Sequence, residues 1–220
     1  MKQNNLVGLV LTVAFIGGIW AAINVAPPAT NISTEATDAE YFQHYPAARA
    51  LPEFSLYTAD DKELTSSDLQ NQWTLVFLGY TFCPDICPAT MAALSRVYPE
   101  LQKIDSEYPI KVLFLSVDPK RDTPQRLSSY KTHFNDAFIA ASGPHNQLFP
   151  LVRSFGLMYS MPESTDQSDY LVDHSGSVVL VGPDAEVIGR FKPQAEPGQL
   201  SIANPAHILS DLPGIVATKS

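Results

Sequence analysis

Two runs of almost continuous apolar residues stand out along the chain, at residues 73–80 and 110–117. Both runs are rich in Val, Leu and Phe, as expected of strands that are buried on both faces of a sheet. Between them, apolar residues recur at helical spacing, at Met91, Leu94, Val97, Leu101 and Ile104. The pattern predicts a strand, a helix and a second strand that form a right-handed parallel unit.

Further elements follow from the same periodicities. Apolar spacing predicts a helix at residues 123–134, another at about 147–155 and a strand at 172–181. The stretch 161–169 is polar, has no period and is expected to be a loop. Strands and helices that alternate in this way predict the α/β fold class.

The N-terminal part of the chain has a different pattern. Residues 6–26 are uncharged and almost wholly apolar, and roughly 20 helical residues span a bilayer core of about 30 Å. Lys2 and the terminal amine precede this run, so the positive-inside rule predicts a membrane helix with its N-terminus in the cytoplasm. The alternative is a cleaved signal peptide, but the small-residue sites near Ala21 and Ala26 match that pattern poorly.

The following residues, 27–50, contain several prolines and small polar residues without apolar periodicity, and are interpreted as a tether. The folded domain is then expected to comprise residues 51–220, which face the periplasm or an equivalent extracytoplasmic space. No internal repeat is apparent in it.

Composition narrows the class of partner. The chain of 220 residues is 45% hydrophobic and 17% charged, as is usual for one globular domain with an appendage. A net charge of -9 without an extended Lys/Arg cluster argues against nucleic acid or anionic lipid as the main partner. A protein or a small ion is expected instead.

The two cysteines of the chain, Cys83 and Cys87, directly follow the first buried run. Ligand sites in open α/β sheets lie outside the carboxyl ends of strands, so this is a functional position. Each cysteine precedes a proline, which predicts that both thiols lie on a loop and that a helix begins at Pro88. Cys87 would then lie at a helix N-terminus, where the dipole lowers the pKa of a thiol.

Three roles are open to this cysteine pair. A stapling disulfide suits an oxidising compartment, but closing so short a loop stabilises a fold little. Two adjacent reactive thiols can instead perform redox chemistry or bind a soft metal. The spacing alone does not choose between these two roles.

His174 lies near the beginning of the predicted strand at 172–181. If that strand runs antiparallel to the first two, His174 lies at the edge of the sheet from which the cysteines emerge. By pattern alone, a lone histidine at a strand end is more often solvated or bonded to the backbone. The remaining histidines lie in the tether or in polar and helical settings, and no role is expected for them: His44, His133, His145 and His207.

Three motifs together resemble the Sco/SenC family of copper-handling proteins. They are FLGYTFCPDICP at 77–88, SVDPKRDTP at 116–124 and YLVDHS at 170–175. The resemblance extends from about residue 54 to residue 191 and keeps the family order of the motifs. One departure is the sequence Pro-Asp-Ala at 183–185, where similar proteins usually end the turn with glycine, and it leaves the geometry of that turn open.

The resemblance implies a thioredoxin-like fold in which Cys83, Cys87 and His174 bind copper. It also implies a role in assembling the binuclear copper centre of cytochrome c oxidase, with the copper-receiving subunit as partner. The chemistry agrees, because two thiolates suit Cu(I) and an added imidazole makes Cu(II) tolerable. Asp118 follows the second buried run and is a candidate for a group behind the ligands that orients one of them or takes a proton. A simple turn aspartate fits that position equally well.

Two functions therefore compete. The first is a copper-delivery and assembly factor that binds metal without catalytic turnover. The alternative is a thiol-disulfide oxidoreductase that reduces the cysteines of a copper-receiving partner. A peroxidase of the thioredoxin superfamily is a more distant third possibility. The histidine favours the first function, because thiol exchange does not require it.

Overall fold

The computed structural model describes residues 15, 39–167, 169–194, 198 and 200–217. The chain divides into two compact units, Met1–Ala36 and Thr37–Ser220, and the account below concerns the second. Within the described residues, no helix is long and apolar enough to cross a membrane. The predicted membrane helix at 6–26 lies outside the described residues except for Phe15.

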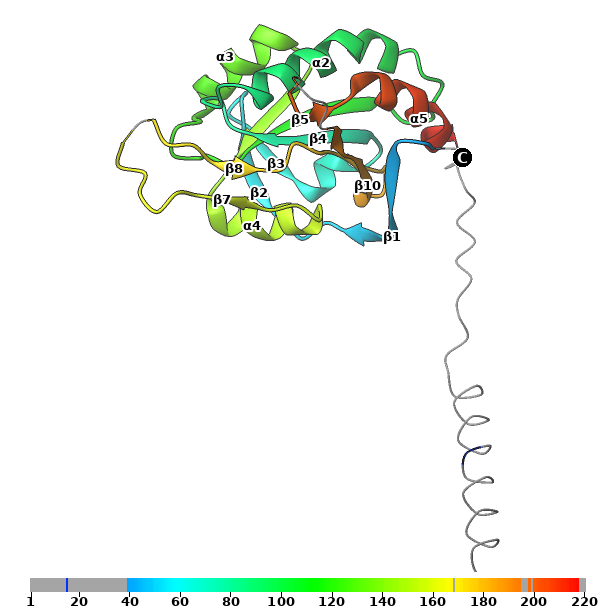
Figure 1. The fold of residues 1–220 in the computed structure, drawn as a ribbon, viewed down its shortest axis with the longest axis horizontal. Helices are drawn as coiled ribbons and strands as arrows, with labels where there is room; N and C mark the ends of the chain where they lie inside the picture. The colour runs from blue at the N-terminus through cyan, green and yellow to red at the C-terminus, as the bar shows by residue number, and fades with distance from the viewer. Residues whose placement is uncertain (1–14, 16–38, 168, 195–197, 199, 218–220) are drawn as a thin grey trace, which may run out of the picture. The chain divides into compact units, whose positions relative to one another are not determined.

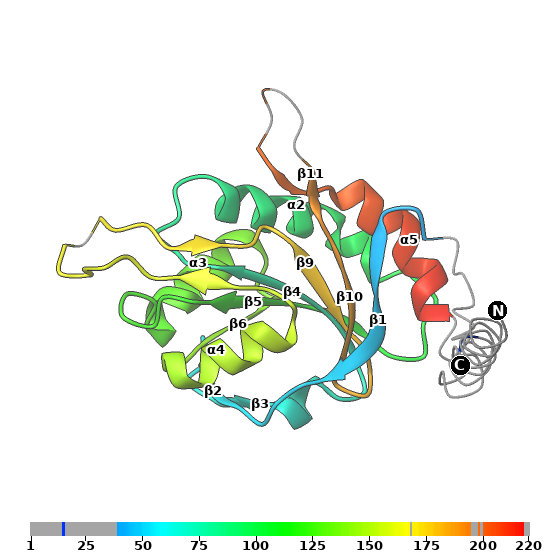
Figure 2. The same cartoon turned by 60° about the horizontal axis from the view of Figure 1, so that its bottom comes forward.

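The domain is built on a mixed sheet of eight strands. These strands are β1 (Phe42–Ala50), β2 (Ser55–Thr58), β3 (Glu63–Thr65), β4 (Trp73–Gly79), β5 (Ile110–Ser116), β6 (Ile139–Ser142), β9 (Val178–Val181) and β10 (Glu186–Phe191). Their order is β1-β10-β9-β4-β5-β6-β2-β3 (Figure 2). Strands β4, β5 and β6 run parallel, and β9 runs antiparallel to β4. Two short ribbons lie outside this sheet, one of β7 (Tyr159–Ser160) with β8 (Asp173–His174) and one of β11 (Pro193–Gln194) with β12 (Ile202–Ala203).

Helices cover both faces of the sheet (Figure 1). Helices α2, α3 and α5 lie on one face and α4 lies on the other. Their bounds are α2 Ile86–Leu101, α3 Pro124–Phe134, α4 His145–Ser154 and α5 Pro205–Ala217, with a 3-10 helix η1 at Ser66–Leu69. Because β4 and β9 lie in the middle of this sandwich, all their residues are buried, as the apolar run at 73–80 predicted for β4.

Most of the expected elements are confirmed. Strands β4 and β5 are parallel and in register from Trp73 with Ile110 to Gly79 with Ser116, and α2 connects them. Helices α3 and α4 occupy the two predicted helical stretches, and residues 161–169 form the expected loop as far as they are described. The α/β class with a mixed central sheet is therefore correct.

The predicted tether at 27–50 is wrong in its last part. Strand β1 occupies Phe42–Ala50 and pairs antiparallel with β10, so the folded domain begins before residue 51. Sequence pattern missed this strand because most of its residues are exposed at the sheet edge, and its register shifts between His44 and Arg49, around Pro46. Phe42 anchors the strand by packing on Phe191, with ring centroids 4.9 Å apart.

The strand predicted at 172–181 is two strands. Strand β8 pairs with β7 in a separate ribbon, and β9 enters the central sheet only at Val178. The segment between them, residues 175–177, leaves the pleat and is tied by a hydrogen bond from the backbone N–H of Ser177 to Oγ of Ser175. His174 therefore belongs to the ribbon and not to the sheet.

The turn between β9 and β10 resolves the departure from the family pattern. The N–H of Gly182 donates to the carbonyl of Glu186, and the N–H of Ala185 donates to the carbonyl of Gly182, both at 2.9 Å. Ala185 adopts the left-handed backbone region with φ of 55°. This is the position at which glycine would be free of steric strain.

Candidate metal centre

The cysteine segment begins with a tight turn at the carboxyl end of β4 and leads directly into α2. The N–H of Cys83 donates to the carbonyl of Tyr80 at 3.2 Å, and the helix begins at Ile86 with Asp85 as its N-cap. Cys87 is therefore in the first helical turn, whereas Cys83 lies on the loop before it. The predicted helix start at Pro88 is wrong, and the prediction of a loop position is correct for Cys83 and wrong for Cys87. First-turn amides have no intrahelical acceptor, so Pro88 costs no hydrogen bond there and the helix starts earlier.

The sulfur of Cys87 is fully buried under the sheet edge. A Cβ atom at Gly79 would lie 2.9 Å from Sγ of Cys87 and 2.7 Å from the ring of Phe114. The absence of a side chain at the end of β4 is what allows the first turn of α2 to approach so closely. Cys83 is half-buried and lies toward solvent.

His174 reaches the cysteines from the β7–β8 ribbon. Its Nε2 lies 3.3 Å from Sγ of Cys87, and its Nδ1 lies 3.1 Å from the carbonyl oxygen of Ser175. A carbonyl only accepts, so Nδ1 carries the proton and the Nε2 lone pair points to the sulfur. The rings of Phe77 and Tyr80 contact the imidazole by edge-to-face packing, at centroid distances of 6.2 and 5.8 Å.

Cys83, Cys87 and His174 thus form one cluster, with their ligand atoms all within 4.8 Å of one another. A pocket of about 210 Å³ opens beside them, lined by Tyr80, Cys83, Pro84, Asp85, Ile86, Leu171, Val172, Asp173 and His174. Two sulfurs and one imidazole nitrogen at this spacing suit a soft or borderline metal ion such as copper or zinc.

The two thiols have opposite electrostatic environments. A hydrogen bond from Cys87 to the sulfur of Cys83, assisted by the backbone N–H groups of Cys87 and Asp85, lowers the pKa of Cys83 to about 4. Burial, reinforced by the neighbouring Cys83, raises the pKa of Cys87 well above that of an ordinary thiol. The expectation that Cys87 is the activated thiol is therefore wrong, because desolvation outweighs the helix dipole at that position. Cys83 carries the thiolate.

Asp118 lies at the same edge of the sheet but binds none of the three clustered side chains. Its fully buried carboxylate accepts a hydrogen bond from the hydroxyl of Tyr170 at 2.6 Å and pairs with Nε of Arg121. The Arg121 guanidinium also stacks on the Tyr170 ring, 3.5 Å from its centroid. Asp118 therefore holds the segment that leads to His174, and it is not placed to take a proton from a ligand.

Asp122 is a residue of this region that the sequence reasoning missed. Its buried carboxylate accepts from the N–H of Thr81 at 2.9 Å, from the Thr81 hydroxyl at 2.7 Å and from the Ser116 hydroxyl at 2.6 Å. Burial raises the pKa of this carboxyl despite these bonds. Its presence in the second motif was the available signal, but a pattern does not show which carboxylates are buried.

Residues 43–206 match the SCO1/SenC family. The chain belongs to the SCO1/SenC family. A Stutzerimonas stutzeri protein that is named as copper-binding is 35% identical over 147 residues, which cover 67% of this chain and 71% of that protein. The mitochondrial SCO1 homolog of Homo sapiens is 30% identical over 155 residues, covering 70% of this chain and 52% of that protein. The chain therefore spans about half the length of the human relative.

Solved structures share the fold of this SCO1/SenC member. The copper-bound ScoI of Arabidopsis thaliana is similar with a TM-score of 0.59 at 28% identity, covering 73% of this chain and 96% of that chain. This likeness agrees with the thioredoxin-like fold that the motifs imply.

The other four histidines of this SCO1/SenC member lie apart from the metal cluster. His145 contacts the Tyr159 hydroxyl through Nδ1 at 2.7 Å, and His207 stacks on the ring of Tyr41. His44 packs edge-on against Phe42 and His133 against Phe134. The structure gives each of them an aromatic neighbour and brings none of them to Cys83 and Cys87.

Proposed function

We propose that this protein binds copper through Cys83, Cys87 and His174 and delivers it to, or prepares, the binuclear copper centre of cytochrome c oxidase. The observation that carries the proposal is the convergence of two sulfurs and an imidazole nitrogen within 4.8 Å. Copper is supported by relatives in the SCO1/SenC family that are named as copper-binding or solved with copper bound, and the oxidase is the destination that the resemblance of the three motifs implies.

The donor set suits a carrier of copper. The Cys83 thiolate is a soft ligand that is already ionised at neutral pH, and copper binding displaces the proton of Cys87. The Nε2 lone pair of His174 adds a nitrogen donor, which Cu(II) prefers. Three protein ligands leave coordination positions that an incoming ligand of a receiving protein can occupy.

The first experiment is metal analysis of the reduced and oxidised protein after exposure to copper. The reduced protein is expected to bind one copper per chain, and the form with a Cys83–Cys87 disulfide is expected to bind none, because a disulfide sulfur is no thiolate ligand. Equal uptake by both forms would contradict the assignment of the cysteines.

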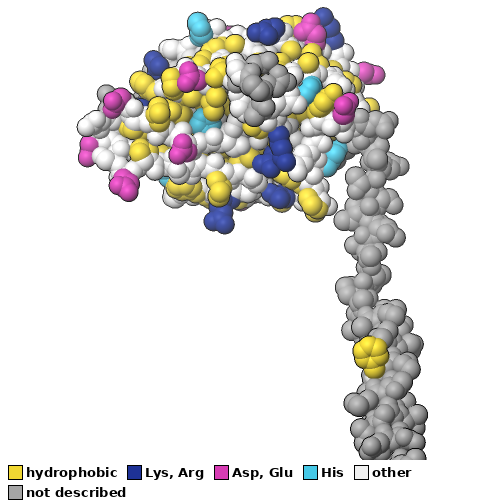
Figure 3. Space-filling view, viewed as in Figure 1, with side chains coloured by type: hydrophobic (Ala, Val, Ile, Leu, Met, Phe, Trp, Pro, Cys, Tyr) yellow, Lys and Arg dark blue, Asp and Glu magenta, His cyan; other side chains and the backbone are white. Residues whose placement is uncertain are grey.

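A protein partner is supported by the surface around the cluster. Exposed large hydrophobic side chains lie beside it, with Phe82 44% exposed, Leu171 62% exposed and Met158 78% exposed. Leu171 lines the pocket with Cys83 and His174, and Met158 lines a second pocket with His174. In Figure 3, hydrophobic and acidic side chains share the surface at the end of the domain that carries β7 and β8. Exposed apolar side chains grouped around a site are typical of a protein contact.

The alternative function is thiol-disulfide exchange, and the electrostatic asymmetry of the cysteines favours it as a second candidate. An accessible thiolate at Cys83 beside a buried thiol at Cys87 suits an attacking and a resolving cysteine. The substitution His174→Ala separates the two functions. In a copper carrier it leaves Cu(I) on two thiolates, weakens Cu(II) and changes disulfide reduction little. Unchanged Cu(II) binding with impaired exchange would make the oxidoreductase the leading function.

We also propose that residues 6–26 anchor the protein in the inner membrane, with the domain in the periplasm or an equivalent space. The support is the uncharged apolar run preceded by Lys2. N-terminal sequencing of the protein from the membrane fraction is expected to read from the beginning of the chain. A mature terminus near residue 27 would show cleavage instead.

A further inference from the structure

The second sequence motif, at residues 116–124, contributes no side chain to the cluster, yet it carries two fully buried carboxylates, Asp118 and Asp122. A buried carboxylate is costly unless donors surround it, so each must be matched to a specific set of partners. Outside the motif itself, the two carboxylates bind side chains on different segments. One segment carries the cysteines and the other carries the histidine.

Asp122 binds the cysteine segment. It accepts both the backbone N–H and the hydroxyl of Thr81, which lies two residues before Cys83. Nε of Arg126 donates to the same hydroxyl at 2.9 Å. The backbone that leaves β4 is therefore fixed at Thr81, immediately before the turn that presents the Cys83 sulfur.

Asp118 binds the histidine segment. It accepts the hydroxyl of Tyr170, which lies four residues before His174, and it pairs with the Arg121 guanidinium that stacks on the Tyr170 ring. The phenol is thus held both by its hydroxyl and by its face. This is a side-chain link between the second motif and the segment that enters β8.

The two carboxylates belong to one rigid turn. The hydroxyl of Ser116 donates to Asp122 at 2.6 Å and accepts the N–H of Asp118 at 3.1 Å. The N–H of Asp122 donates to the carbonyl of Asp118 at 3.0 Å. Because Asp122 binds Thr81 and Asp118 binds Tyr170, this turn holds Thr81 and Tyr170 at a fixed separation.

We propose that Asp118 and Asp122 are positioning residues that set the distance between the thiol pair and the imidazole, each acting on one ligand segment. Asp122 places the cysteines through Thr81, and Asp118 places His174 through Tyr170. The part of the proposal that concerns copper rests on the proposed function, whereas the placement of His174 in the metal-free protein does not.

The sharpest variant is Tyr170→Phe, which removes one hydroxyl and keeps the ring under Arg121. We expect its Cu(II) affinity to fall by about tenfold, as is usual when a group behind a metal ligand is lost, while Cu(I) affinity changes less than about twofold. The matched control is Tyr45→Phe, which removes a tyrosine hydroxyl bonded at 2.7 Å to the carbonyl of Phe155 and should leave both affinities unchanged. Thr81→Val is expected to weaken both oxidation states, because it acts on the cysteines.

A double variant distinguishes positioning from general destabilisation. In the His174→Ala background, Tyr170→Phe should cause no further loss of Cu(II) affinity, because the imidazole that it positions is gone. A further tenfold loss in that background would overturn the proposal, since it would show that Tyr170 acts on copper by another route.

The metal-free readout is NMR of the reduced full chain in detergent micelles, with labelled histidine and aromatic residues. Nuclear Overhauser contacts of the His174 imidazole with the rings of Phe77 and Tyr80 should be present in the wild type and in Tyr45→Phe and lost in Tyr170→Phe. Loss of these contacts in a chain that binds no copper would refute the proposed function and support the positioning role. Retained contacts together with wild-type copper affinities in Tyr170→Phe would overturn the positioning role itself.

Discussion

Cys83 and Cys87 have the same chemistry in sequence and opposite chemistry in the fold. The sulfur of Cys83 is half-exposed and accepts hydrogen bonds, whereas Cys87 is fully buried and donates one. In the metal-free state, one thiol of the pair is ionised, and the negative charge is on the accessible sulfur of Cys83. A metal ion or a disulfide that approaches the site would therefore meet Cys83 first.

This asymmetry predicts the pH profile of alkylation in the metal-free reduced protein. With a pKa of about 4, Cys83 is ionised throughout the neutral range, so its reaction with iodoacetamide should already be at its plateau rate at about pH 6. The rate should fall only as pH drops through the folded pKa. Cys83→Ser should leave a protein that reacts very slowly at about pH 7, because burial keeps Cys87 protonated. Mass spectrometry of the alkylated protein against pH is the measurement, and first modification at Cys87 would contradict it.

Gly79 is a second residue whose effect is predicted from its closest contacts. Gly79→Ala would place a Cβ atom 2.9 Å from the Cys87 sulfur and 2.7 Å from the Phe114 ring, so both must shift. We expect a loss of about 1–3 kcal/mol in the free energy of unfolding, as for other overpacked cores, together with weaker Cu(I) binding. Urea denaturation and a Cu(I) competition assay measure the two effects.

The matched control for Gly79 is Gly214→Ala in α5, where an added Cβ meets nothing within 4 Å. Alanine should stabilise that helix by about 0.5–1 kcal/mol and leave copper binding unchanged. A stability loss at Gly214 as large as that at Gly79 would show that the contact with Cys87 is not the cause.

At the scale of elements, sequence periodicity predicted what lies in the middle of the sheet and failed at its margins. Strands β4 and β5 are buried on both faces apart from the half-buried Lys111, so hydrophobic burial dictates most of their residues and the pattern is clear. The edge strand β1 buries only Phe42 fully, and its sequence carries little of that signal. The pairing of β7 with β8 joins segments that lie apart in the chain, and hydrophobic periodicity does not predict such a pairing.

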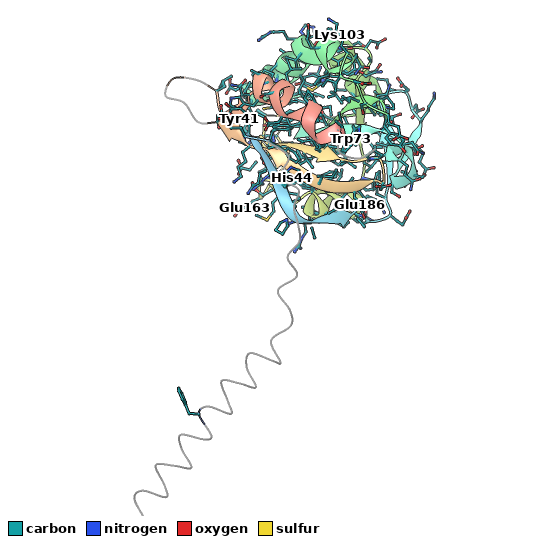
Figure 4. The ribbon with its side chains drawn as sticks, turned by 90° about the vertical axis from the view of Figure 1, so that its right-hand side faces the viewer. Tyr41, His44, Trp73, Lys103, Glu163 and Glu186 are labelled. Carbon is teal, nitrogen blue, oxygen red and sulfur yellow. The ribbon has the colours of Figure 1, made fainter. Side chains whose placement is uncertain are left out.

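The attachment of β1 gives a prediction for an element. Asp211 of α5 is buried and accepts the N–H groups of Tyr41 at 2.6 Å and Phe42 at 2.7 Å (Figure 4 labels Tyr41 beside this helix). Asp211→Asn weakens a charged acceptor, so we expect a loss of about 1–3 kcal/mol and faster amide hydrogen exchange at the start of β1. Asp68→Asn is the control, because Asp68 also binds a backbone N–H and a hydroxyl, both of Thr65, but at an exposed position. Its loss should be smaller, and equal losses would contradict the argument.

At the scale of the whole molecule, the sequence predicted the three clustered residues but not the scaffold that joins them. Cys83, Cys87 and His174 were recognised through a family resemblance, and they are brought together by the antiparallel return of β9 beside β4 and by the β7–β8 ribbon that precedes it. Asp122, Thr81 and Tyr170 were not recognised. Their roles depend on which polar atoms are enclosed when the helices cover the sheet, and that is a property of the closed fold.

The exposed apolar surface beside the cluster predicts a variant that separates binding from delivery. Phe82→Ser with Leu171→Ser should keep copper affinity within about twofold of wild type. It should slow the proposed transfer of copper to the copper-binding domain of the oxidase subunit by about tenfold or more, since apolar anchors dominate protein contacts. Stopped-flow absorption of the acceptor domain measures the transfer. Leu200→Ser, at a residue 50% exposed just before β12, is the control and should not slow it. Equal transfer rates in all three proteins would place the contact elsewhere.

The separation of His174 from Cys87 by 87 positions in the chain has a consequence for how the protein matures. A ribosome adds roughly 5–20 residues per second, so the thiols emerge several seconds before the imidazole does. A nascent or unfolded chain therefore offers copper two sulfurs and no nitrogen. The third ligand arrives only when β9 has inserted beside β4 and the ribbon has followed. A complete ligand set thus requires the tertiary fold, and copper bound with the imidazole reports a molecule in which β9 and the β7–β8 ribbon are in place.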